Sequence, residues 1–219
     1  MKKIPIEKYV ALNDLITVLK NSGFLNQKNV ESAFRNYPRH EFVPKSEIDK
    51  GYHNQPLQIM NNQTISQPAV VSRMTEWLDV KEGQKILEIG SGSGWQTAIL
   101  SYLVGDGTVY SVEIHPEVAK FAKENLEKFQ INNVKIITDD GSIGYPAGAP
   151  FDRIIMTAAC DEIPYPLFEQ LAENGLIIAP VGGSLQSLIL LKKTPKGIVE
   201  IKNQTNYVFV PLLGRFAKK

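Results

Sequence analysis

The N-terminal part of the chain carries hydrophobic residues at helical spacing. Apolar residues recur every three or four positions over residues 8–22, which predicts an amphipathic helix that ends at Gly23. A second helix is expected between an N-cap at Asn26 and Pro38, because the proline ring disfavours helical geometry in the residue before it. The next segment, residues 44–68, is polar, rich in Asn and Gln and too long for an ordinary connection. We therefore expect a functional loop there.

From Lys85 onward, short apolar runs alternate with helical patterns. The predicted strands cover residues 85–89, 109–113, 134–138, 151–156 and 176–180, and the predicted helices cover residues 95–103, 116–129 and 164–172. Strands that are apolar on both faces are typical of a parallel sheet with helices on either side. Two further strands, at 187–192 and 207–212, are joined by a segment too short for a crossover helix, so we expect an antiparallel pair at one edge. The order of these two strands stays open.

Together these elements predict an α/β fold, a doubly wound and mostly parallel sheet of seven strands with an antiparallel edge. The chain has 219 residues, which suits one domain rather than two. We expect that single domain, residues 1–219, to consist of an N-terminal helical and loop extension, residues 1–60, followed by the core, residues 61–219.

Composition and charge exclude several classes of protein. Hydrophobic residues make up 43% of the chain and charged residues 21%, which is typical of a globular domain. The 24 basic and 23 acidic residues leave a net charge of +1, so the chain lacks the basic footprint of proteins that bind nucleic acid or anionic lipid. The single cysteine and three histidines form no cluster at metal-ligand spacing, so no metal is expected. Without a signal-peptide pattern or an apolar run of membrane-spanning length, the chain is expected to be cytoplasmic.

A glycine-rich turn lies between the strand predicted at 85–89 and the following helix. Gly90, Gly92 and Gly94 alternate with serines there. Glycine allows a sharp turn and close approach of a ligand, and the free N–H groups at a helix start attract electron-rich groups. Glu113 ends the next strand, where its carboxylate can accept hydrogen bonds from both hydroxyls of a ribose. The two features predict a ligand that contains adenosine.

Two other interpretations of this turn stay open. In the first, the glycines only bring helix and strand close together, and Glu113 is a solvated strand end. In the second, the ligand is a dinucleotide such as NAD, although Trp95 stands where the dinucleotide fingerprint requires glycine or alanine.

Further motifs occur on both sides of the glycine turn. Residues 39–44 read Arg-His-Glu-Phe-Val-Pro, residues 63–68 read Gln-Thr-Ile-Ser-Gln-Pro, residues 140–145 read Asp-Gly-Ser-Ile-Gly-Tyr and residues 209–212 read Phe-Val-Pro-Leu. In this order they resemble the motifs of the protein-L-isoaspartate (D-aspartate) O-methyltransferase family, and the Thr-Ile-Ser segment is the most discriminating of them. The fold that this resemblance implies is the Rossmann-like fold of class I methyltransferases.

The resemblance implies a reaction and its partners. S-adenosyl-L-methionine is the methyl donor, S-adenosyl-L-homocysteine the product, and the acceptor is the α-carboxylate of an isoaspartyl residue in a damaged protein or peptide. The methyl ester then closes to a succinimide, which starts repair. Because a carboxylate is ionised near neutral pH, it needs no general base, in keeping with the lack of a catalytic histidine constellation. The family further implies a monomer.

On the acceptor side, the resemblance assigns the active-site role to Ser66. We expect its hydroxyl to orient the acceptor carboxylate rather than to act as a nucleophile, since no base stands at a recognisable spacing. By residue type alone, Ser66 is better explained as a turn or N-cap residue. By analogy Val210 and Pro211 bind the peptide backbone, although an edge strand ended by proline explains them equally well. The residues expected to shape the same wall as Ser66 are Thr64, Ile65 and Gln67.

On the cofactor side, the resemblance implies that the glycine turn faces the methionine part and Glu113 the ribose. Asp140 with Gly141 would lie at the adenine, with Asp139 as a rival of Asp140. Glu88 either contacts the amino-acid end of the cofactor or is an ordinary strand residue that faces a helix. The expected cofactor-binding residues are Glu88, Gly90, Ser91, Gly92, Ser93, Gly94, Glu113, Ile114, Asp140 and Gly141.

Three other functions are weighed against this interpretation. A methyltransferase of the same fold that acts on nucleic acid or a small metabolite is one, but residues 157–160 lack the Pro-Pro-aromatic box of enzymes that modify bases. An NAD-dependent oxidoreductase is disfavoured by Trp95 and by the lack of a catalytic Tyr-Lys pair, and a scaffold that binds the cofactor without catalysis is the third. We assign His53 and His115 to surface or turn positions, and Cys160 to a small buried hydrophobe.

Overall fold

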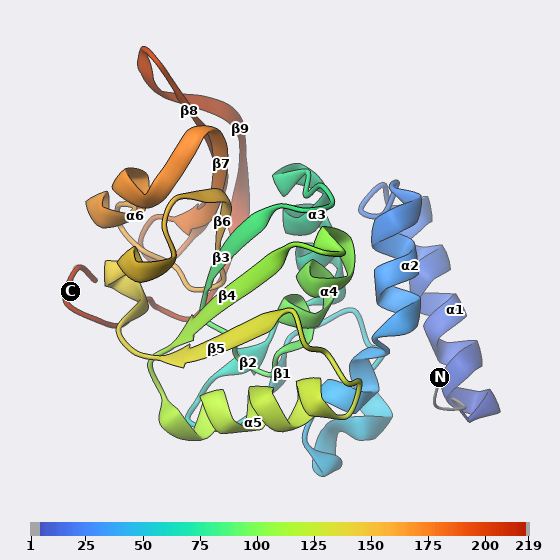
Figure 1. Ribbon diagram of the computed structural model, residues 1–219. Coiled ribbons are helices and arrows are strands. Elements are labelled where there is room, and N and C mark those ends of the chain that lie inside the picture. The colour runs from blue at the N-terminus through green and yellow to red at the C-terminus, as the bar shows by residue number, and fades with distance from the viewer. Residues whose placement is uncertain (1–4, 218–219) are drawn as a thin grey trace.

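The computed structural model describes residues 5–217 and has a seven-stranded sheet at its centre (Figure 1). The strands are β3 (Lys85–Ile89), β4 (Thr108–Glu113), β5 (Val134–Thr138), β6 (Phe151–Met156), β7 (Leu171–Val181), β8 (Gln186–Thr194) and β9 (Gly197–Tyr207). Their order across the sheet is β5-β4-β3-β6-β7-β8-β9. The first five are parallel, and β8 and β9 are antiparallel to their neighbours. The predicted sheet is confirmed, and β8 lies inside β9.

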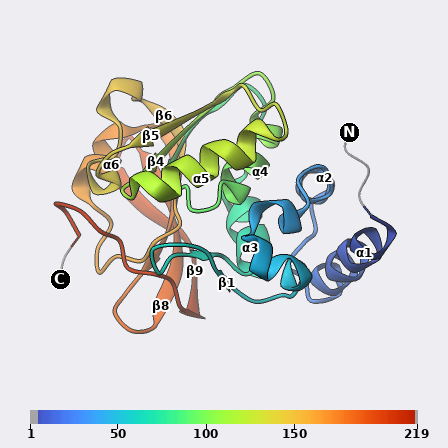
Figure 2. The ribbon, with the colours of Figure 1, turned by 90° about the horizontal axis from the view of Figure 1, so that it is seen from below.

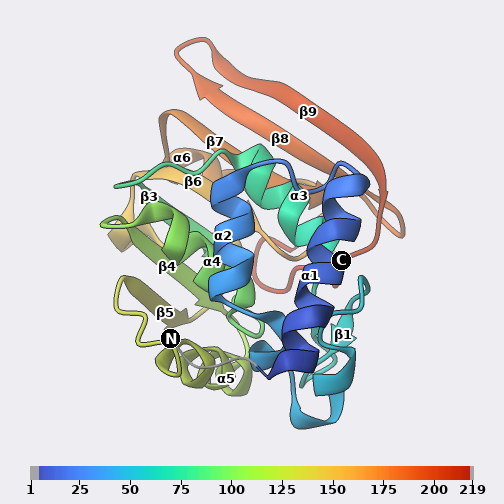
Figure 3. The same cartoon turned by 90° about the vertical axis from the view of Figure 1, so that its right-hand side faces the viewer.

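Helices cover the sheet in layers (Figure 2). On one face lie α3 (Pro68–Leu78) and α4 (Trp95–Val104), with α1 (Ile6–Asn21) and α2 (Lys28–Asn36) outside them (Figure 3). α5 (Pro116–Glu127) runs beside β5 and β4, and α6 (Tyr165–Gln170) lies on the opposite face with the C-terminal segment. The loop between α2 and α3 holds two 3-10 turns, η1 (Arg39–Phe42) and η2 (Lys45–Lys50), and two short strands, β1 (Leu57–Gln58) and β2 (Thr64–Ile65).

The sheet buries both of its faces, as the apolar runs predict. In β3, Ile86 belongs to a core cluster with Phe34 and Trp95, whereas its neighbour Leu87 belongs to a second cluster with Phe151 on the other face. Side chains of a strand alternate between faces, so consecutive apolar residues are needed to fill both clusters. Apolar residues of α1 and α2 join the first cluster, so the N-terminal extension and the sheet share one core.

The predicted N-cap of the second helix is wrong. α2 starts at Lys28 without a side-chain cap from its own segment. Instead Glu76 of α3 accepts hydrogen bonds from the main-chain N–H groups of Asn26 and Gln27, at 2.5 and 2.6 Å. A carboxylate near a helix N-terminus satisfies free N–H groups and interacts favourably with the helix dipole. A residue remote in sequence therefore does what Asn26 was expected to do.

The last predicted strand is also misplaced. β9 runs from Gly197 to Tyr207 rather than over residues 207–212, and all but the last of its residues are exposed. β8 and β9 form a long hairpin that projects from the sheet (Figures 1 and 3). An exposed edge strand lacks the apolar run that marks a buried strand, so the hydrophobic pattern does not reveal it. Residues 208–212 instead continue as an extended segment along the C-terminal ends of the parallel strands.

Candidate active site

The glycine turn joins β3 to α4 in left-handed backbone conformations. The φ angles of Gly90, Gly92 and Gly94 are 93°, 52° and 82°, a region that side chains rarely tolerate. A Cβ at Gly90 would collide with the hydroxyl of Thr157, which donates hydrogen bonds to the carbonyls of Gly90 and Ile89 at 2.7 and 3.1 Å. A Cβ at Gly92 would meet only open space, with the Thr64 carbonyl oxygen 3.9 Å away. Hydrogen bonds from Thr157 thus hold the turn at Gly90, and the side of Gly92 that faces Thr64 is open.

Glu113 stands beside this turn at the end of β4. Its Oε2 accepts a hydrogen bond from the Gly92 N–H at 3.0 Å, and its Oε1 accepts one from the His115 N–H at 3.1 Å. An ionised carboxylate has about four acceptor positions, so each oxygen keeps acceptor capacity on the cavity side. The parallel pairing of β3 with β4 brings these two strand ends together.

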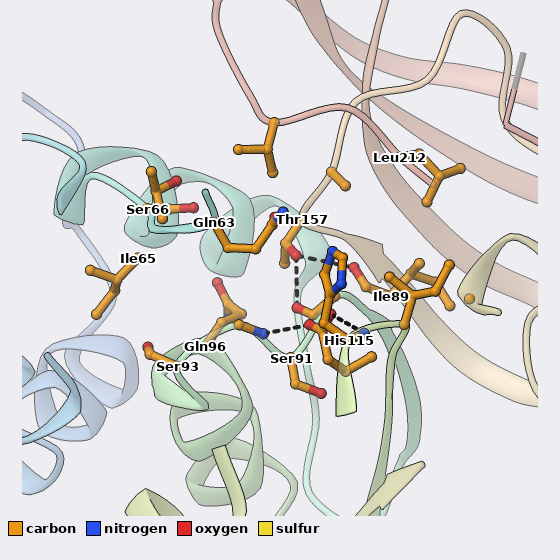
Figure 4. A pocket seen from close by; sticks show the side chains of 18 of the residues that line it. Gln63, Ile65, Ser66, Ile89, Ser91, Ser93, Gln96, His115, Thr157 and Leu212 are labelled. Carbon is orange, nitrogen blue, oxygen red and sulfur yellow. Dashed lines mark hydrogen bonds between the residues drawn. The ribbon is translucent and has the colours of Figure 1, made fainter. Parts of the chain in front are cut away.

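The turn and Glu113 form the floor of a cavity of about 860 Å³ that is open to solvent. Residues 63–66, which include β2, form a second wall, and residues 210–213 of the C-terminal segment form a third. Figure 4 shows Ile65 and Ser66 on one side of this cavity and Leu212 on the other. The C-terminal wall is fixed because the Ala159 N–H donates to the Val210 carbonyl and the Leu212 N–H donates to the Ala159 carbonyl.

A second cavity, of about 1220 Å³, adjoins the first. The described residues that line it include no Asp, Glu, Lys or Arg, and several carry amides, among them Asn54, Gln67, Gln204 and Asn206. Four residues line both cavities and mark the place where they meet: Thr64, Ser66, Thr157 and Val210. In the described part of the chain the Ser66 hydroxyl has no hydrogen-bond partner, and α3 starts without a side-chain cap. Ser66 is therefore not an N-cap, and its hydroxyl is available to a ligand.

Most of the residues expected from the sequence lie around these cavities. The first cavity is lined by Thr64, Ile65, Ser66, Gly90, Ser91, Gly92, Ser93, Glu113, Ile114, Gly141, Val210 and Pro211. Gln67 lines only the second cavity, where its amide donates to the Asn54 carbonyl at 2.9 Å. Gly94 packs against Ala122 of α5 instead of lining either cavity, so it allows the turn to approach a helix closely.

Glu88 lies behind the turn rather than in the cavity. Its carboxylate is fully buried and accepts hydrogen bonds from the hydroxyls of Thr97 and Ser111, and the latter is paired with the Ser91 hydroxyl. Burial raises the pKa of Glu88 to about 8, although the hydroxyl hydrogen bonds oppose this shift. The structure thus places Glu88 as the helix-facing strand residue that was the alternative to a cofactor contact.

Asp140 is tied to the C-terminal segment. Its Oδ1 accepts hydrogen bonds from the N–H and the hydroxyl of Ser142, and its Oδ2 accepts one from the Arg215 N–H at 2.6 Å. Neither Asp140 nor its rival Asp139 lines the first cavity, whereas Gly141 does. Asp140 thus anchors a neighbouring segment, and its expected contact with adenine stays a prediction.

Several residues that line the cavities were not predicted from the sequence. His115 was expected on the surface or in a turn, but its ring points into the first cavity, and its buried Nε2 has no hydrogen-bond partner in the described part of the chain (Figure 4). Thr157 follows β6 directly, so its place at the carboxyl end of a parallel strand was the signal that could have identified it. Of the other assignments, His53 is exposed and Cys160 is buried, as expected.

Metal sites and membrane-spanning helices are both absent from residues 5–217. No group of three or more His, Cys, Asp or Glu side chains in this range is arranged to hold a metal ion. No helix in the same range is long and apolar enough to span a membrane.

The chain is similar to proteins of one family over nearly its whole length. The family model described as protein-L-isoaspartate(D-aspartate) O-methyltransferase matches residues 10–217. A protein-L-isoaspartate O-methyltransferase from Methanococcoides burtonii is 42% identical over 203 residues, which cover 92% of this chain and 99% of that protein. The protein of the same name from Pyrococcus horikoshii is 42% identical over 210 residues, or 95% of each chain.

Solved structures show the same likeness. A protein-L-isoaspartate O-methyltransferase superposes with a TM-score of 0.85 at 32% identity, over 94% of this chain and 67% of that one. A chain from Plasmodium falciparum, in complex with S-adenosyl-L-homocysteine, has a TM-score of 0.81 at 24% identity, over 91% of this chain and 97% of that one. The second comparison shows the shared fold, the Rossmann-like fold of methyltransferases that the sequence predicted.

Proposed function

Because this chain belongs to the protein-L-isoaspartate(D-aspartate) O-methyltransferase family, we propose that its methyl transfer takes place where the two cavities meet. The protein is an S-adenosyl-L-methionine-dependent carboxyl O-methyltransferase that acts on the α-carboxylate of isoaspartyl residues in damaged proteins and so starts their repair through a succinimide. The bound cofactor supplies a methyl group on a sulfonium sulfur, and its product is S-adenosyl-L-homocysteine. The single observation that carries the placement is that Ser66 and the glycine turn line one cavity.

The first cavity fits the cofactor. The open side of Gly92 leaves room for a ligand against the main chain, and the Glu113 carboxylate has acceptor capacity for ribose hydroxyls. We assign Ser91 and Ser93 to the methionine side with the turn. Ile114 and Gly141 are assigned to the adenine side. Asp140 is given an indirect role, through the C-terminal segment that it anchors.

Ser66 is assigned to the acceptor. Its hydroxyl donates a hydrogen bond to one oxygen of the isoaspartyl carboxylate and leaves the other oxygen to attack the methyl carbon. No general base takes part, because the carboxylate is already ionised. The contribution of the protein is therefore to align the reacting atoms and to exclude water.

The second cavity is assigned to the acceptor peptide. Val210 stands at the junction and Pro211 beside it, and Gln67 lies on the far wall. A lining of amides and apolar groups can bind an extended main chain without a requirement for charged neighbours in the peptide. The near-neutral net charge and this uncharged lining also favour a peptide over a nucleic acid as substrate.

We further propose that one chain is sufficient for activity, as a monomer in the cytoplasm. Both cavities are built by residues of a single chain. The single cysteine means that the chain makes no disulfide of its own, so it does not depend on an oxidising compartment for one.

The test is methyl transfer to an isoaspartyl peptide and to its aspartyl twin, with Ser66→Ala as the variant. A hydrogen bond to a charged group contributes about 1.5–3 kcal/mol, so we expect turnover on the isoaspartyl peptide to fall roughly ten- to hundredfold. The Kd for S-adenosyl-L-homocysteine should stay unchanged, which separates loss of alignment from loss of cofactor binding. Wild-type turnover in Ser66→Ala would contradict the role of Ser66, and equal methylation of both peptides would contradict the acceptor.

A further inference from the structure

Arg39 is a buried cation directly behind the cavity wall that residues 63–66 form. It begins η1 and is 1% exposed. Its guanidinium donates hydrogen bonds only to main-chain carbonyl oxygens, at 3.0 to 3.3 Å. The carbonyls belong to Gly51, His53, Gln55, Ile65 and Ser66.

These hydrogen bonds join Arg39 to two segments of the loop between α2 and α3. One is the stretch of residues 51–55, and the other carries Ile65 and Ser66. β2 itself pairs with β1 through only two residue pairs, Leu57 with Ile65 and Gln58 with Thr64. Such a short ladder is marginal by itself, and the guanidinium adds a hydrogen bond that holds the Ser66 carbonyl in place.

Arg39 has no acidic partner among residues 5–217. It forms no ion pair there, and its Nε is buried without a hydrogen-bond partner. Burial lowers the pKa of Arg39 to about 9, so the side chain is still charged at neutral pH. Burial of a cation without a counter-ion carries a large desolvation cost, which carbonyl dipoles offset only in part. A neutral side chain would avoid this desolvation cost. We therefore expect the positive charge of Arg39 to have a function.

The site supplies an anion that this cation can serve. Among the described residues that line the two cavities, Glu113 is the only Asp, Glu, Lys or Arg, so an acceptor carboxylate meets no Lys or Arg side chain on the lining. Arg39 is bonded directly to the lining residues Ile65 and Ser66. It also lies 5.5 Å from the ring centre of Trp95, which follows the glycine turn and lines the cofactor cavity. Inside a protein a charge acts more strongly and is less screened by salt than in water.

From these contacts we infer that Arg39 is a positioning residue for methyl transfer: it fixes the segment that carries Ser66, and its positive charge draws the acceptor carboxylate to the junction of the cavities. The inference rests on the proposed role of Ser66. In addition, the charge of Arg39 explains why an anionic acceptor is preferred.

The experiment compares binding of two peptides, one with an isoaspartyl carboxylate and one with the neutral carboxamide at the same position. Arg39→Gln removes the charge, and Arg39→Lys keeps a charge but loses the planar set of donors. We expect Arg39→Gln to reduce the preference for the carboxylate peptide at least tenfold and to lower kcat. Arg39→Lys should keep most of the preference and still lose kcat. The Kd for S-adenosyl-L-homocysteine should change less than twofold in both.

Arg153→Gln is the matched control. The guanidinium of Arg153 also donates to main-chain carbonyls, those of Leu78, Asp79 and Asp152, but Arg153 lines neither cavity. This variant should lose stability without a change in peptide preference. An Arg39→Gln enzyme with wild-type preference and kcat would overturn the inference, as would an Arg39→Lys enzyme with wild-type kcat.

Ser66→Ala decides the case if the Arg39 variants do not fold. Because this variant keeps Arg39, it should still bind the carboxylate peptide at least threefold more tightly than the carboxamide. Loss of all preference in Ser66→Ala would show that the hydroxyl, and not Arg39, selects the anion. The outcomes separate the two claims. Wild-type turnover in Ser66→Ala contradicts the proposed function. Reduced turnover in Ser66→Ala, together with wild-type kcat and peptide preference in the Arg39 variants, contradicts only this inference.

Discussion

Glu113 uses one carboxylate to hold the glycine turn and to face the cofactor cavity. In a Glu113→Gln variant the amide nitrogen cannot accept hydrogen bonds, so the turn or the ribose loses a partner. A hydrogen bond to a charged group contributes about 1.5–3 kcal/mol. We therefore expect the Kd for S-adenosyl-L-homocysteine, measured by isothermal titration calorimetry, to rise roughly ten- to hundredfold.

Glu117→Gln is the control for this measurement. Glu117 is an exposed residue in the first turn of α5, and its carboxylate accepts a hydrogen bond from the Asn61 side chain at 3.3 Å. It lines neither cavity, so its substitution should leave cofactor affinity unchanged. Equal affinities of the two variants would remove Glu113 from the cofactor site.

Glu88 makes the stability of the fold depend on pH. Burial raises its pKa to about 8 from an ordinary value of 4.5, so between these values the folded state keeps a proton that the unfolded state releases. The free energy of unfolding therefore falls as pH rises through this window, with a slope of at most about 1.4 kcal/mol per pH unit. Urea unfolding over this range should show the fall in wild type and not in Glu88→Gln, because a carboxamide does not titrate. Parallel pH profiles would contradict the buried proton.

Residue chemistry could be predicted from the sequence only where a motif and a strand end coincide. Glu113 was identified because it closes a strand after the glycine turn. His115, two residues further on, was not, because nothing in the sequence distinguishes a ring that enters a cavity from one in a solvated turn. The Asp140 side chain was expected at the adenine, and no local pattern shows that a residue 75 positions later also bonds to it.

The C-terminal strap, residues 210–217, forms one wall of the cofactor cavity. Its N-terminal half lines the cavity, and its other half is held by hydrogen bonds from the Arg215 N–H to Asp140 and from the Phe216 N–H to Ser142. Gly214 is in a left-handed conformation with φ of 125°, and a Cβ there would collide with the Asp140 carboxylate. The strap can therefore lie against Asp140 only with glycine at this position.

Gly214→Ala should release the strap. We expect faster trypsin cleavage after Arg215 and a several-fold weaker affinity for S-adenosyl-L-homocysteine, since each of the two lost hydrogen bonds contributes about 0.5–1.5 kcal/mol. Gly183→Ala is the control, because a Cβ at Gly183 meets nothing within 4 Å and its φ is not in the left-handed region. Equal proteolysis of Gly214→Ala and wild type would show that Asp140 does not anchor the strap.

The second cavity, which we propose binds the acceptor peptide, has no charged side chain among its described lining residues, and the cation behind it, Arg39, is buried. The charge of residues that flank the isoaspartyl site should therefore matter little. We expect KM values for peptides with Lys or Glu neighbours to agree within roughly threefold, and to change little between about 50 and 300 mM salt, because buried charges are poorly screened. The measurement is KM for the two peptides over a series of ionic strengths. A steep fall of peptide affinity with salt would indicate recognition by exposed charges instead.

Local sequence patterns were enough to predict the buried parallel strands and the glycine turn. Apolar runs that fill both faces of a strand specify buried parallel strands, and three alternating glycines before a helix specify the turn. The family motifs added the reaction and pointed to Ser66. All of these signals are local, because they depend on residues that are neighbours in the chain.

Contacts between residues that are distant in sequence could be seen only in the tertiary structure. It placed Glu76 at the start of α2, Asp140 against the strap and Arg39 behind Ser66. It also showed that β9 is an exposed edge strand. The physical reason is the same in each case: a buried or capping polar group must be satisfied by whichever partner the fold brings near, and sequence distance does not encode that partner.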